Sequence, residues 1–281
     1  MRPGRCDIAL VLALLPGISG AWDALVAPAA ASSAQLGVSE LPGRFSVVSW
    51  NVHKETDSVF TSELGALLDS TSADLVLLQE CVHPGGSRLD SALEGRAWAL
   101  SANLRTGASE AATGVLTASS SLQGFEAMLS RGGEPLLGTR KPMLATLHRA
   151  AGGPLLAINL HALNFSLGVN GFRQQLGDVA KVAASHAGPV LVAGDFNTWS
   201  ARRLRVADSV LGAASLVRLD FGDAERDKRR AFGRPLDQIY YDPRRLRPVP
   251  GASGVPLRFR SSDHPPLVAG FEMVRDQRPA E

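Results

Sequence analysis

The chain has 281 residues, of which 45% are hydrophobic and 20% charged, and this is enough to bury the core of one large α/β domain. A formal net charge of +2 is too small to indicate a nucleic-acid or membrane partner from bulk charge. The two cysteines, Cys6 and Cys81, belong to no Cys/His cluster, which argues against a disulfide framework and a thiolate zinc site.

Positive charge is concentrated in one stretch of the chain. Residues 201–250 contain 12 Lys/Arg against 7 Asp/Glu, a local excess of +5, so the remainder carries −3. Beside a binding or catalytic site, such a segment would attract an anionic substrate. A solvated Arg-rich loop and helix face is the alternative interpretation.

Residues 1–40 differ from the rest of the chain. Arg2 and Arg5 precede an apolar run over 8–15, and a small-residue tract follows over 27–34. This order resembles a secretory signal, which favours a periplasmic or secreted protein. A disordered Ala/Ser/Pro-rich extension on a cytoplasmic enzyme is the alternative. No apolar run reaches the roughly 18 residues of a membrane span, so we expect no stable span.

The regular pattern predicts one mixed α/β domain over residues 41–276, followed by a tail over 277–281. Apolar runs and alternation predict mainly antiparallel strands, among them a hairpin of 143–147 with 155–160. The expected strands are 45–50, 74–79, 97–103, 114–118, 143–147, 155–160, 190–193, 236–241 and 266–271. The expected helices are 57–70, 170–186 and 201–211.

Polar residues stand where these apolar strands end. Since side chains i and i+2 lie on one side of a strand, Asp195 and Asn197 should point into one site. Each such residue alone is more often a cap or turn residue, but buried carboxylates are costly unless they are paired or metal-bound. Their recurrence predicts a metal-assisted phosphoester hydrolase. The residues concerned are Asn51, Glu80, His161, Asp195, Asn197, Asp263 and His264.

Six spaced motifs occur in an order that resembles the endonuclease/exonuclease/phosphatase superfamily, which includes DNase I, abasic endonucleases, sphingomyelinases and inositol polyphosphate 5-phosphatases. The match runs from about residue 44 to 271, and longer strings over 161–169, 193–200 and 229–237 resemble its YafD-type branch. The motifs are Trp50-Asn51, Gln79-Glu80, Asn159-Leu160-His161, Gly194-Asp195-Phe196-Asn197, Leu236-Asp237-Gln238-Ile239 and Ser262-Asp263-His264.

The resemblance implies a four-layer α/β sandwich of two mainly antiparallel sheets flanked by helices (DNase I-like), with the active site at one end. It also implies a metal site at Glu80, with Asn51 holding that carboxylate or a water of the metal and Asp263 as a second acidic group. Mg²⁺ suits hard oxygen donors of this kind, and Mn²⁺ is a possible substitute.

The resemblance further implies the catalytic roles. Asp195 and Asn197 would orient the attacking water, and His264, held by Asp237, would contact a phosphate oxygen. The base is assigned to Asp195, although the sequence leaves His264 open for that role. His161 would contact the phosphate as well.

Three further residues are expected to bind substrate. Asn164 follows His161 by three residues, and in some family members an Asn likewise follows the phosphate-contacting residue by a few positions. Lys141 and Arg234, like Arg229 and Arg230, could line a substrate groove, although each alone is more often a surface residue.

The leading functional hypothesis is a monomeric Mg²⁺-dependent phosphodiesterase that acts on nucleic acid. A phospholipid head group or an inositol phosphate is the alternative substrate, although no exposed aromatic hairpin for membrane entry is evident in the sequence. A binding module that has lost catalysis is a third hypothesis, which the complete set of polar residues disfavours. The Trp-Ser-Gly element of abasic endonucleases is absent around 113–115, which argues against abasic repair.

Overall fold

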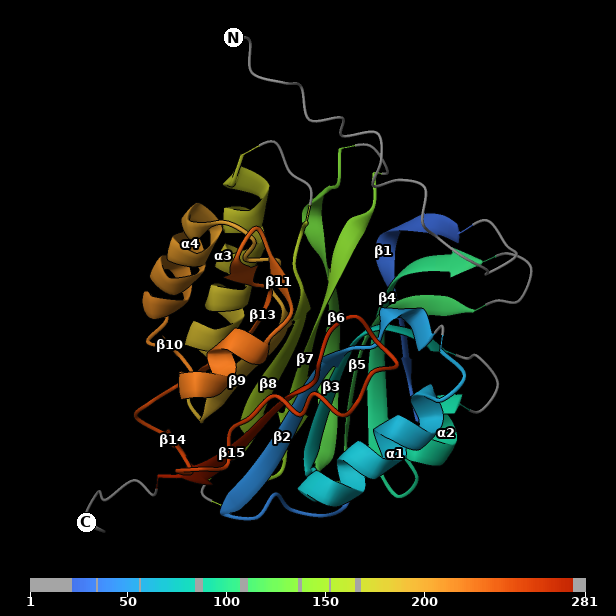
Figure 1. Cartoon of the computed structure of the whole chain (residues 1–281), viewed down its shortest axis with the longest axis vertical. Coiled ribbons are helices and arrows are strands. Elements are labelled where there is room, and N and C mark those ends of the chain that lie inside the picture. Colours follow the sequence, from blue (N-terminus) through green and yellow to red (C-terminus); the bar gives the residue numbers. More distant parts are fainter. Residues whose placement is uncertain are drawn as a thin grey trace, which may run out of the picture.

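The computed structural model describes residues 22–33, 35–55, 57–83, 88–106, 111–135, 138–151, 153–164 and 168–274. Two β-sheets pack face to face, and helices cover their outer faces (Figure 1). The seven-stranded sheet has the order β1 (Trp22–Ser32), β4 (Ala97–Thr106), β5 (Ala112–Ser119), β3 (Leu75–His83), β2 (Arg44–Asn51), β15 (Leu267–Met273) and β14 (Leu246–Pro248). The six-stranded sheet has the order β10 (Val217–Arg218), β13 (Asp237–Tyr241), β9 (Val190–Asp195), β8 (Leu155–His161), β7 (Arg140–His148) and β6 (Leu122–Gly133).

The helices form the two outer layers. In the first, α1 (Phe60–Thr71) and α2 (Arg88–Ala92) pack on the seven-stranded sheet, and in the second, α3 (Asn170–Ser185) and α4 (Ala201–Gly212) pack on the six-stranded sheet. Two short segments, η2 (His53–Glu55) and η3 (Gly222–Asp227), and a small hairpin of β11 (Arg230–Ala231) and β12 (Arg234–Pro235) complete the fold. The expected four-layer α/β sandwich is confirmed.

Strand alternation assigns each side chain to a layer. On β2, Phe45 and Val47 face the other sheet, whereas Val48 and Trp50 belong to the cluster that contains the buried residues of α1. The same alternation on β9 sends Leu191 toward the other sheet and Val192 toward the helices. Burying two apolar faces in this way is what holds the layers together.

Two parallel pairs bring the polar strand ends to one place. β2 pairs with β3 so that Asn51 lies opposite Gln79, and β8 pairs with β9 so that His161 lies opposite Asp195. The other pairings within the two main sheets are antiparallel, including β7 with β8, as expected from the sequence. Because parallel strands end at the same edge, their last residues are neighbours.

Six strands were not predicted, and β1 and β6 are the two long ones among them. Trp22–Ser32, which the sequence pattern assigns to an N-terminal extension, forms β1 and pairs with β4 through partners such as Ala29 with Ala102. Its run of alanines has no polar–apolar alternation, so it carries no strand signal. The signal-like residues before 22 and the tail over 277–281 lie outside the described residues. β6 is a half-exposed edge strand with few apolar positions.

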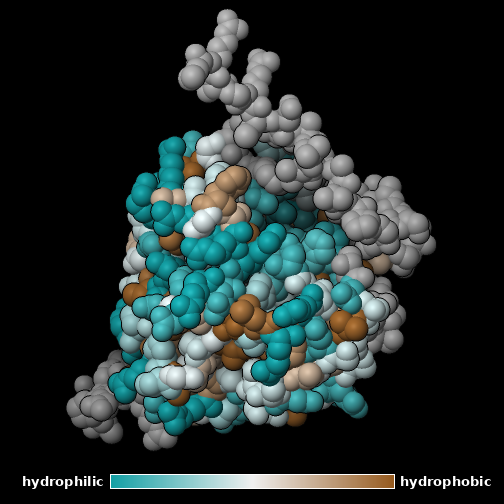
Figure 2. All heavy atoms as spheres, in the orientation of Figure 1, coloured by the Kyte–Doolittle hydropathy of each residue, from teal (hydrophilic) through white to brown (hydrophobic). Residues whose placement is uncertain are grey.

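The described part of the chain holds no helix with the length and apolar character that a membrane span requires. Figure 2, in the orientation of Figure 1, shows a surface that is largely hydrophilic, with a hollow above the middle of this face.

Candidate active site

The rows of side chains between the two sheets turn polar at one end. On β3 the apolar residues Leu75 and Leu77 are followed by Gln79, and on β8 the apolar Ala157 is followed by Asn159. The Gln79 amide donates from Nε2 to Oδ1 of Asn159 over 2.9 Å, which joins the sheets. This buried amide pair separates the apolar core from the site above it.

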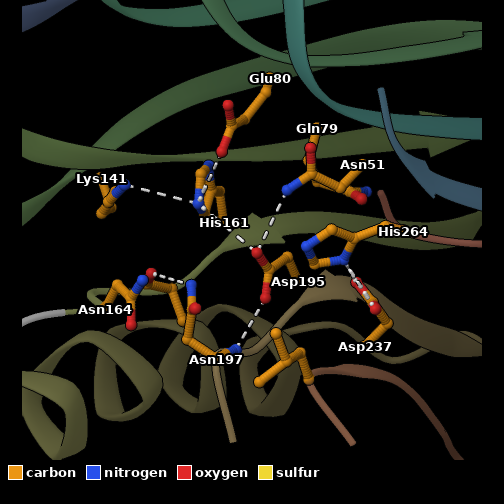
Figure 3. A network of polar contacts seen from close by, with 12 residues as sticks. Asn51, Gln79, Glu80, Lys141, His161, Asn164, Asp195, Asn197, Asp237 and His264 are labelled. Carbon is orange, nitrogen blue, oxygen red and sulfur yellow. Dashed lines mark hydrogen bonds and ion pairs between the residues drawn. The ribbon is translucent and has the colours of Figure 1, made fainter. Parts of the chain in front are cut away.

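Asp195 lies at the centre of the site (Figure 3). Its Oδ2 accepts a hydrogen bond from Nδ2 of Asn51 at 3.2 Å and lies 3.7 Å from Nε2 of His161. Asp195 is 3% exposed and His161 is 6% exposed. The three expected residues at the ends of β2, β8 and β9 are therefore brought together.

Asp195 and Asn197 are neighbours for a reason other than the strand alternation that the sequence suggested. β9 ends at Asp195, and Asn197 has a left-handed backbone with φ of 50°. The Asn197 N–H donates to Oδ1 of Asp195 over 2.8 Å, an Asx-type turn, and its Nδ2 donates to the Ala162 carbonyl over 3.0 Å. The turn aims the carboxylate and fixes Asn197 beside it.

Glu80 leaves the regular pattern of β3 through a bulge. The register with β5 shifts between Gln79 and Cys81, and Glu80 has φ of 55°. The extra residue lets Cys81 join the cluster on the α1 side, a position that simple alternation would give to residue 80. The Glu80 carboxylate instead lies 3.8 Å from Nε2 of His161.

Lys54 is a site residue that the sequence did not predict. Its Nζ donates to Oε2 of Glu80 over 2.7 Å. The three residues of η2, His53, Lys54 and Glu55, all have positive φ, between 46° and 56°. Strain of this kind persists only where the surroundings enforce it, and it is common at functional sites. The only sequence signal was a lysine three residues after Asn51.

A buried histidine–aspartate pair forms the opposite side of the site. Nδ1 of His264 lies 2.9 Å from Oδ2 of Asp237, and the indole N–H of Trp50 donates to the His264 carbonyl over 2.7 Å. The Ser262 hydroxyl accepts from the His264 N–H and donates to the Asn51 carbonyl. The predicted partnership of Asp237 and His264 is thus present in the geometry.

The electrostatic environment separates the two histidines. Burial lowers the pKa of His264, but the Asp237 carboxylate outweighs this effect and raises the pKa to about 10, so the ring is charged near neutral pH. Burial and the Lys141 ammonium lower the pKa of His161 to about 4, so that ring is neutral.

The two carboxylates also differ. Burial raises the pKa of Asp195 above its ordinary value, against the opposing charge of His264. Burial would likewise raise the pKa of Glu80, but the cations nearby, Lys54 above all, hold it well below its ordinary value. Asp195 is therefore the better proton acceptor of the two, and Glu80 is the more firmly charged.

Asp263, the expected second metal group, lies at the edge of the site. Its carboxylate is 3.1 Å from the Arg229 guanidinium and 3.5 Å from Nδ1 of His53, and the side chain is 44% exposed. Asp263 is thus paired with Arg229 and His53, whereas the carboxylate of Glu80 is paired with Lys54.

The expected substrate-binding residues lie at three places. Nζ of Lys141 is 3.4 Å from Nε2 of His161 and 3.5 Å from Glu134. The Asn164 carbonyl accepts from the indole N–H of Trp199, while the next residues of that loop, 165–167, lie outside the described part. Arg234 is exposed on β12.

A buried arginine beneath the loops was also missed. Arg203 of α4 is 0% exposed, stacks 4.0 Å from the Phe172 ring, and donates to the carbonyls of Asn197 (2.7 Å) and Leu163. It ties together the loops after β8 and β9. An arginine within an amphipathic helix pattern is normally placed on the solvent side, so the burial of Arg203 leaves no signal in the sequence.

Among the described residues, one group brings three donors for a divalent cation together. Asp195, Asp237 and His264 each offer one ligand atom, and these atoms lie within 4.8 Å of one another. Glu80, the expected metal ligand, is not in this group, and a cation, the Lys54 ammonium, already lies 2.7 Å from its carboxylate. A carboxylate oxygen such as that of Glu80 is of the type that Mg²⁺ prefers.

Comparison with known proteins identifies the family. The profile described as the Endonuclease/Exonuclease/phosphatase family matches residues 48–264. The chain belongs to this family. The matched span includes the site residues from Asn51 to His264.

Curated relatives place it in the expected branch. A UPF0294 protein of Yersinia enterocolitica is 34% identical over 233 residues, which cover 80% of this chain and 83% of that protein. A UPF0294 protein of Yersinia pseudotuberculosis is 41% identical over 140 residues, 50% of this chain and 51% of that protein. The latter match thus spans about half of its relative. The resemblance to the YafD-type branch is confirmed.

Solved structures of low sequence identity share the fold. An endonuclease/exonuclease/phosphatase from Beutenbergia cavernae superposes with a TM-score of 0.63 at 18% identity, covering 82% of this chain and 72% of that one. D. rerio TDP2 complexed with single strand DNA product gives 0.62 at 16% identity, covering 82% and 100%. The human Nocturnin catalytic domain with bound sulfate anion gives 0.57 at 18% identity, covering 82% and 94%.

Proposed function

We propose that this protein is a Mg²⁺-dependent phosphodiesterase that hydrolyses nucleic acid by in-line attack of water on phosphorus. The observation that carries the proposal is the placement of one buried carboxylate, Asp195, between the Asn51 amide and the neutral His161. A charged histidine, His264, lies among the groups next to it. This combination supplies a base and a group that stabilises negative charge within one site.

Asp195 is the proposed general base. Its raised pKa makes it a stronger proton acceptor than an ordinary aspartate, and the Asn51 amide and the Asn197 N–H fix the direction of its oxygens. His264 holds its proton, because Asp237 raises its pKa to about 10, and is therefore unsuited to act as a base near neutral pH. This difference favours Asp195 over the alternative that the sequence left open.

His264 and His161 are proposed to bind the phosphate. The imidazolium of His264 offers Nε2–H as a donor, since Nδ1 is held by Asp237, and it would stabilise the charge that develops on phosphorus-bound oxygens. His161 and the Lys141 ammonium beside it would bind a second oxygen. Asn164 is proposed to contact the substrate beyond that point.

A divalent cation is proposed to bind at Glu80. Its carboxylate stays charged and already attracts one cation, Lys54, and the Asn51 carboxamide and the Asp263 carboxylate are the further oxygen donors proposed for this site. When bound, Mg²⁺ or Mn²⁺ would neutralise phosphate charge and stabilise the leaving oxygen. The group of Asp195, Asp237 and His264 is the alternative cation site, and a metal bound there would have to displace the proton of His264.

Nucleic acid is the proposed substrate class. Arg230 and Arg234 lie on the hairpin that leads into Asp237, and Arg229 directly precedes it; arginines beside a phosphate site favour a polyanionic backbone. That a structural neighbour carries single strand DNA product supports the same choice. Phospholipid or inositol phosphate remains the second candidate, which the experiment below separates.

The test is hydrolysis of single-stranded DNA, duplex DNA, sphingomyelin and inositol phosphates by the whole chain, each with Mg²⁺, Mn²⁺ or EDTA. We expect metal-dependent cleavage of DNA that is lost in Glu80→Gln, an isosteric change that removes only the charge. Cleavage in EDTA, or cleavage of lipid alone, would contradict the proposal.

A further inference from the structure

The small hairpin of β11 and β12 presents an aromatic ring to solvent. Phe232 at its tip is 89% exposed and has φ of 49°, and Gly233 follows with φ of 74°. The left-handed conformation costs a non-glycine residue about 1–2 kcal/mol, and an exposed ring contributes nothing to the core. Two unfavourable features at one residue indicate a role other than folding.

The backbone of the hairpin is held firmly. The Arg230 guanidinium donates to the Gly233 carbonyl at 2.5 Å and to the Glu225 carbonyl at 3.2 Å. At the base of the hairpin the Leu236 N–H donates to the Arg229 carbonyl over 2.9 Å. Phe232 is therefore presented on a fixed support, which lowers the entropy lost when something binds to it.

The hairpin also touches the site. The Phe232 ring lies edge-on to Trp199 with centroids 6.0 Å apart at 65°, and Trp199 follows Asn197 by two residues. Arg229 pairs with Asp263, the neighbour of His264, over 3.1 Å. The aromatic pair and the Arg229 side chain thus lie next to the catalytic residues on the side of the six-stranded sheet.

We propose that Phe232 and Trp199 form a stacking platform for an unpaired nucleobase next to the phosphate that is hydrolysed, and that the platform directs the enzyme to single-stranded nucleic acid. This inference rests on the proposed function. A phosphate held at His161 and His264 would place the adjoining nucleotide toward these rings, with Arg229 and Arg234 near its backbone. Bases in a duplex are paired and stacked already, so they cannot use such a platform.

A lipid surface fits the hairpin less well. One exposed phenylalanine contributes about 1.5–3 kcal/mol when buried, and stable membrane attachment needs more than one such anchor. Three arginines flank this ring within the sequence 229–234. An aromatic ring among guanidinium groups is the composition of a single-strand binding surface.

The experiment measures binding of a fluorescein-labelled DNA single strand by fluorescence anisotropy in EDTA. The strand has about 12 nucleotides, which is within the usual site size of proteins that bind single-stranded nucleic acid. An otherwise identical strand with abasic residues throughout serves as the control ligand. The variants are Phe232→Ala, Phe232→Leu, which keeps an apolar side chain without a ring, and Phe232→Trp. Thermal melts check that each variant is folded.

We expect Phe232→Ala and Phe232→Leu to weaken binding of the base-bearing strand about fivefold or more, since one stacked base contributes at least about 1 kcal/mol. Phe232→Trp should retain the affinity, and all proteins should bind the abasic strand alike. Equal binding by wild type and Phe232→Ala would overturn the proposal. Loss of binding to anionic lipid vesicles in Phe232→Ala, with DNA binding unchanged, would also overturn it in favour of a membrane role.

The outcome is separable from that of the proposed function. If wild type hydrolyses DNA and Phe232→Ala does so with the same KM and kcat, the platform fails and the nuclease stands. If wild type binds the single strand through Phe232 but cleaves no diester with any metal, the nuclease fails and the platform stands as a binding site.

Discussion

The carboxamide of Asn51 and the carboxylate of Asp195 are joined by a 3.2 Å hydrogen bond across the ends of the two sheets. Asn51 ends β2 and Asp195 ends β9, so the bond joins the halves of the sandwich at the place where the site lies. It also leaves Oδ1 of Asp195 to the Asn197 N–H, which means that the orientation of the carboxylate is set from both sides.

The Lys54–Glu80 ion pair is expected to weaken the binding of a divalent cation at Glu80. Because the Lys54 ammonium occupies one oxygen of Glu80, a divalent cation must displace it. Lys54→Met should therefore tighten Mn²⁺ and Mg²⁺ binding about fivefold, the equivalent of about 1 kcal/mol for a partly exposed pair. Isothermal titration calorimetry measures this without any substrate.

Lys54→Arg is the matched control for that measurement. It keeps the positive charge and should bind metal about as weakly as wild type does. Weaker metal binding in Lys54→Met than in wild type would mean that Lys54 supports the metal site instead of competing with it.

Substitution of Arg203 is expected to lower the free energy of unfolding strongly. In Arg203→Met the carbonyls of Asn197 and Leu163 lose their donor in a buried place. We expect the free energy of unfolding to fall by about 2–4 kcal/mol, since each unsatisfied buried acceptor costs about 1–3 kcal/mol. Urea denaturation gives the value. Arg202→Met, one residue away on the exposed face of α4, should change it by less than about 0.5 kcal/mol. Equal effects of the two substitutions would refute the role given to Arg203.

The buried His148 is expected to make the stability of the folded state depend on pH. It is fully buried on β7, where Nε2 lies 2.9 Å from the Thr146 hydroxyl, and burial lowers its pKa from 6.5 to about 3. A depressed pKa means that the folded state disfavours the charged ring, so stability is complete above pH 6.5 and is lost as the pH falls toward 3.

The slope contributed by one such group is at most about 1.4 kcal/mol per pH unit. Urea titrations at several pH values should show a shallower decline in His148→Asn than in wild type over this range. His186→Asn, a change at a half-buried histidine at the end of α3, is the control. An unchanged slope in His148→Asn would contradict the assignment.

Most strands and helices, and the convergence of the site, could be predicted because burial imposes a readable pattern. Apolar rows such as Leu191 to Ala193 mark buried strands, and a polar residue that ends such a row must lie at an edge. Parallel pairing of β2 with β3 and of β8 with β9 then brings Glu80 and Asp195 to one end of the sandwich.

The features that could not be predicted depend on backbone geometry, which produces no periodic pattern in the sequence. The bulge at Glu80 and the left-handed residues of η2 place Lys54 against Glu80, and neither involves glycine, the residue that usually marks a positive φ. The exposed aromatic hairpin at Phe232 was missed for a related reason. Its strands are two residues each, too short to show alternation.

In the proposed mechanism, Asp195 accepts the proton of the attacking water. The most direct test compares kcat/KM for metal-dependent diester hydrolysis in Asp195→Asn and in Asp178→Asn, the same chemical change on the outer helix α3. We expect a loss of about 10²–10⁴-fold in Asp195→Asn, with the fold and metal binding retained, and no loss in Asp178→Asn. Retention of more than about a tenth of the wild-type rate by Asp195→Asn, well short of the loss that general-base catalysis implies, would contradict it.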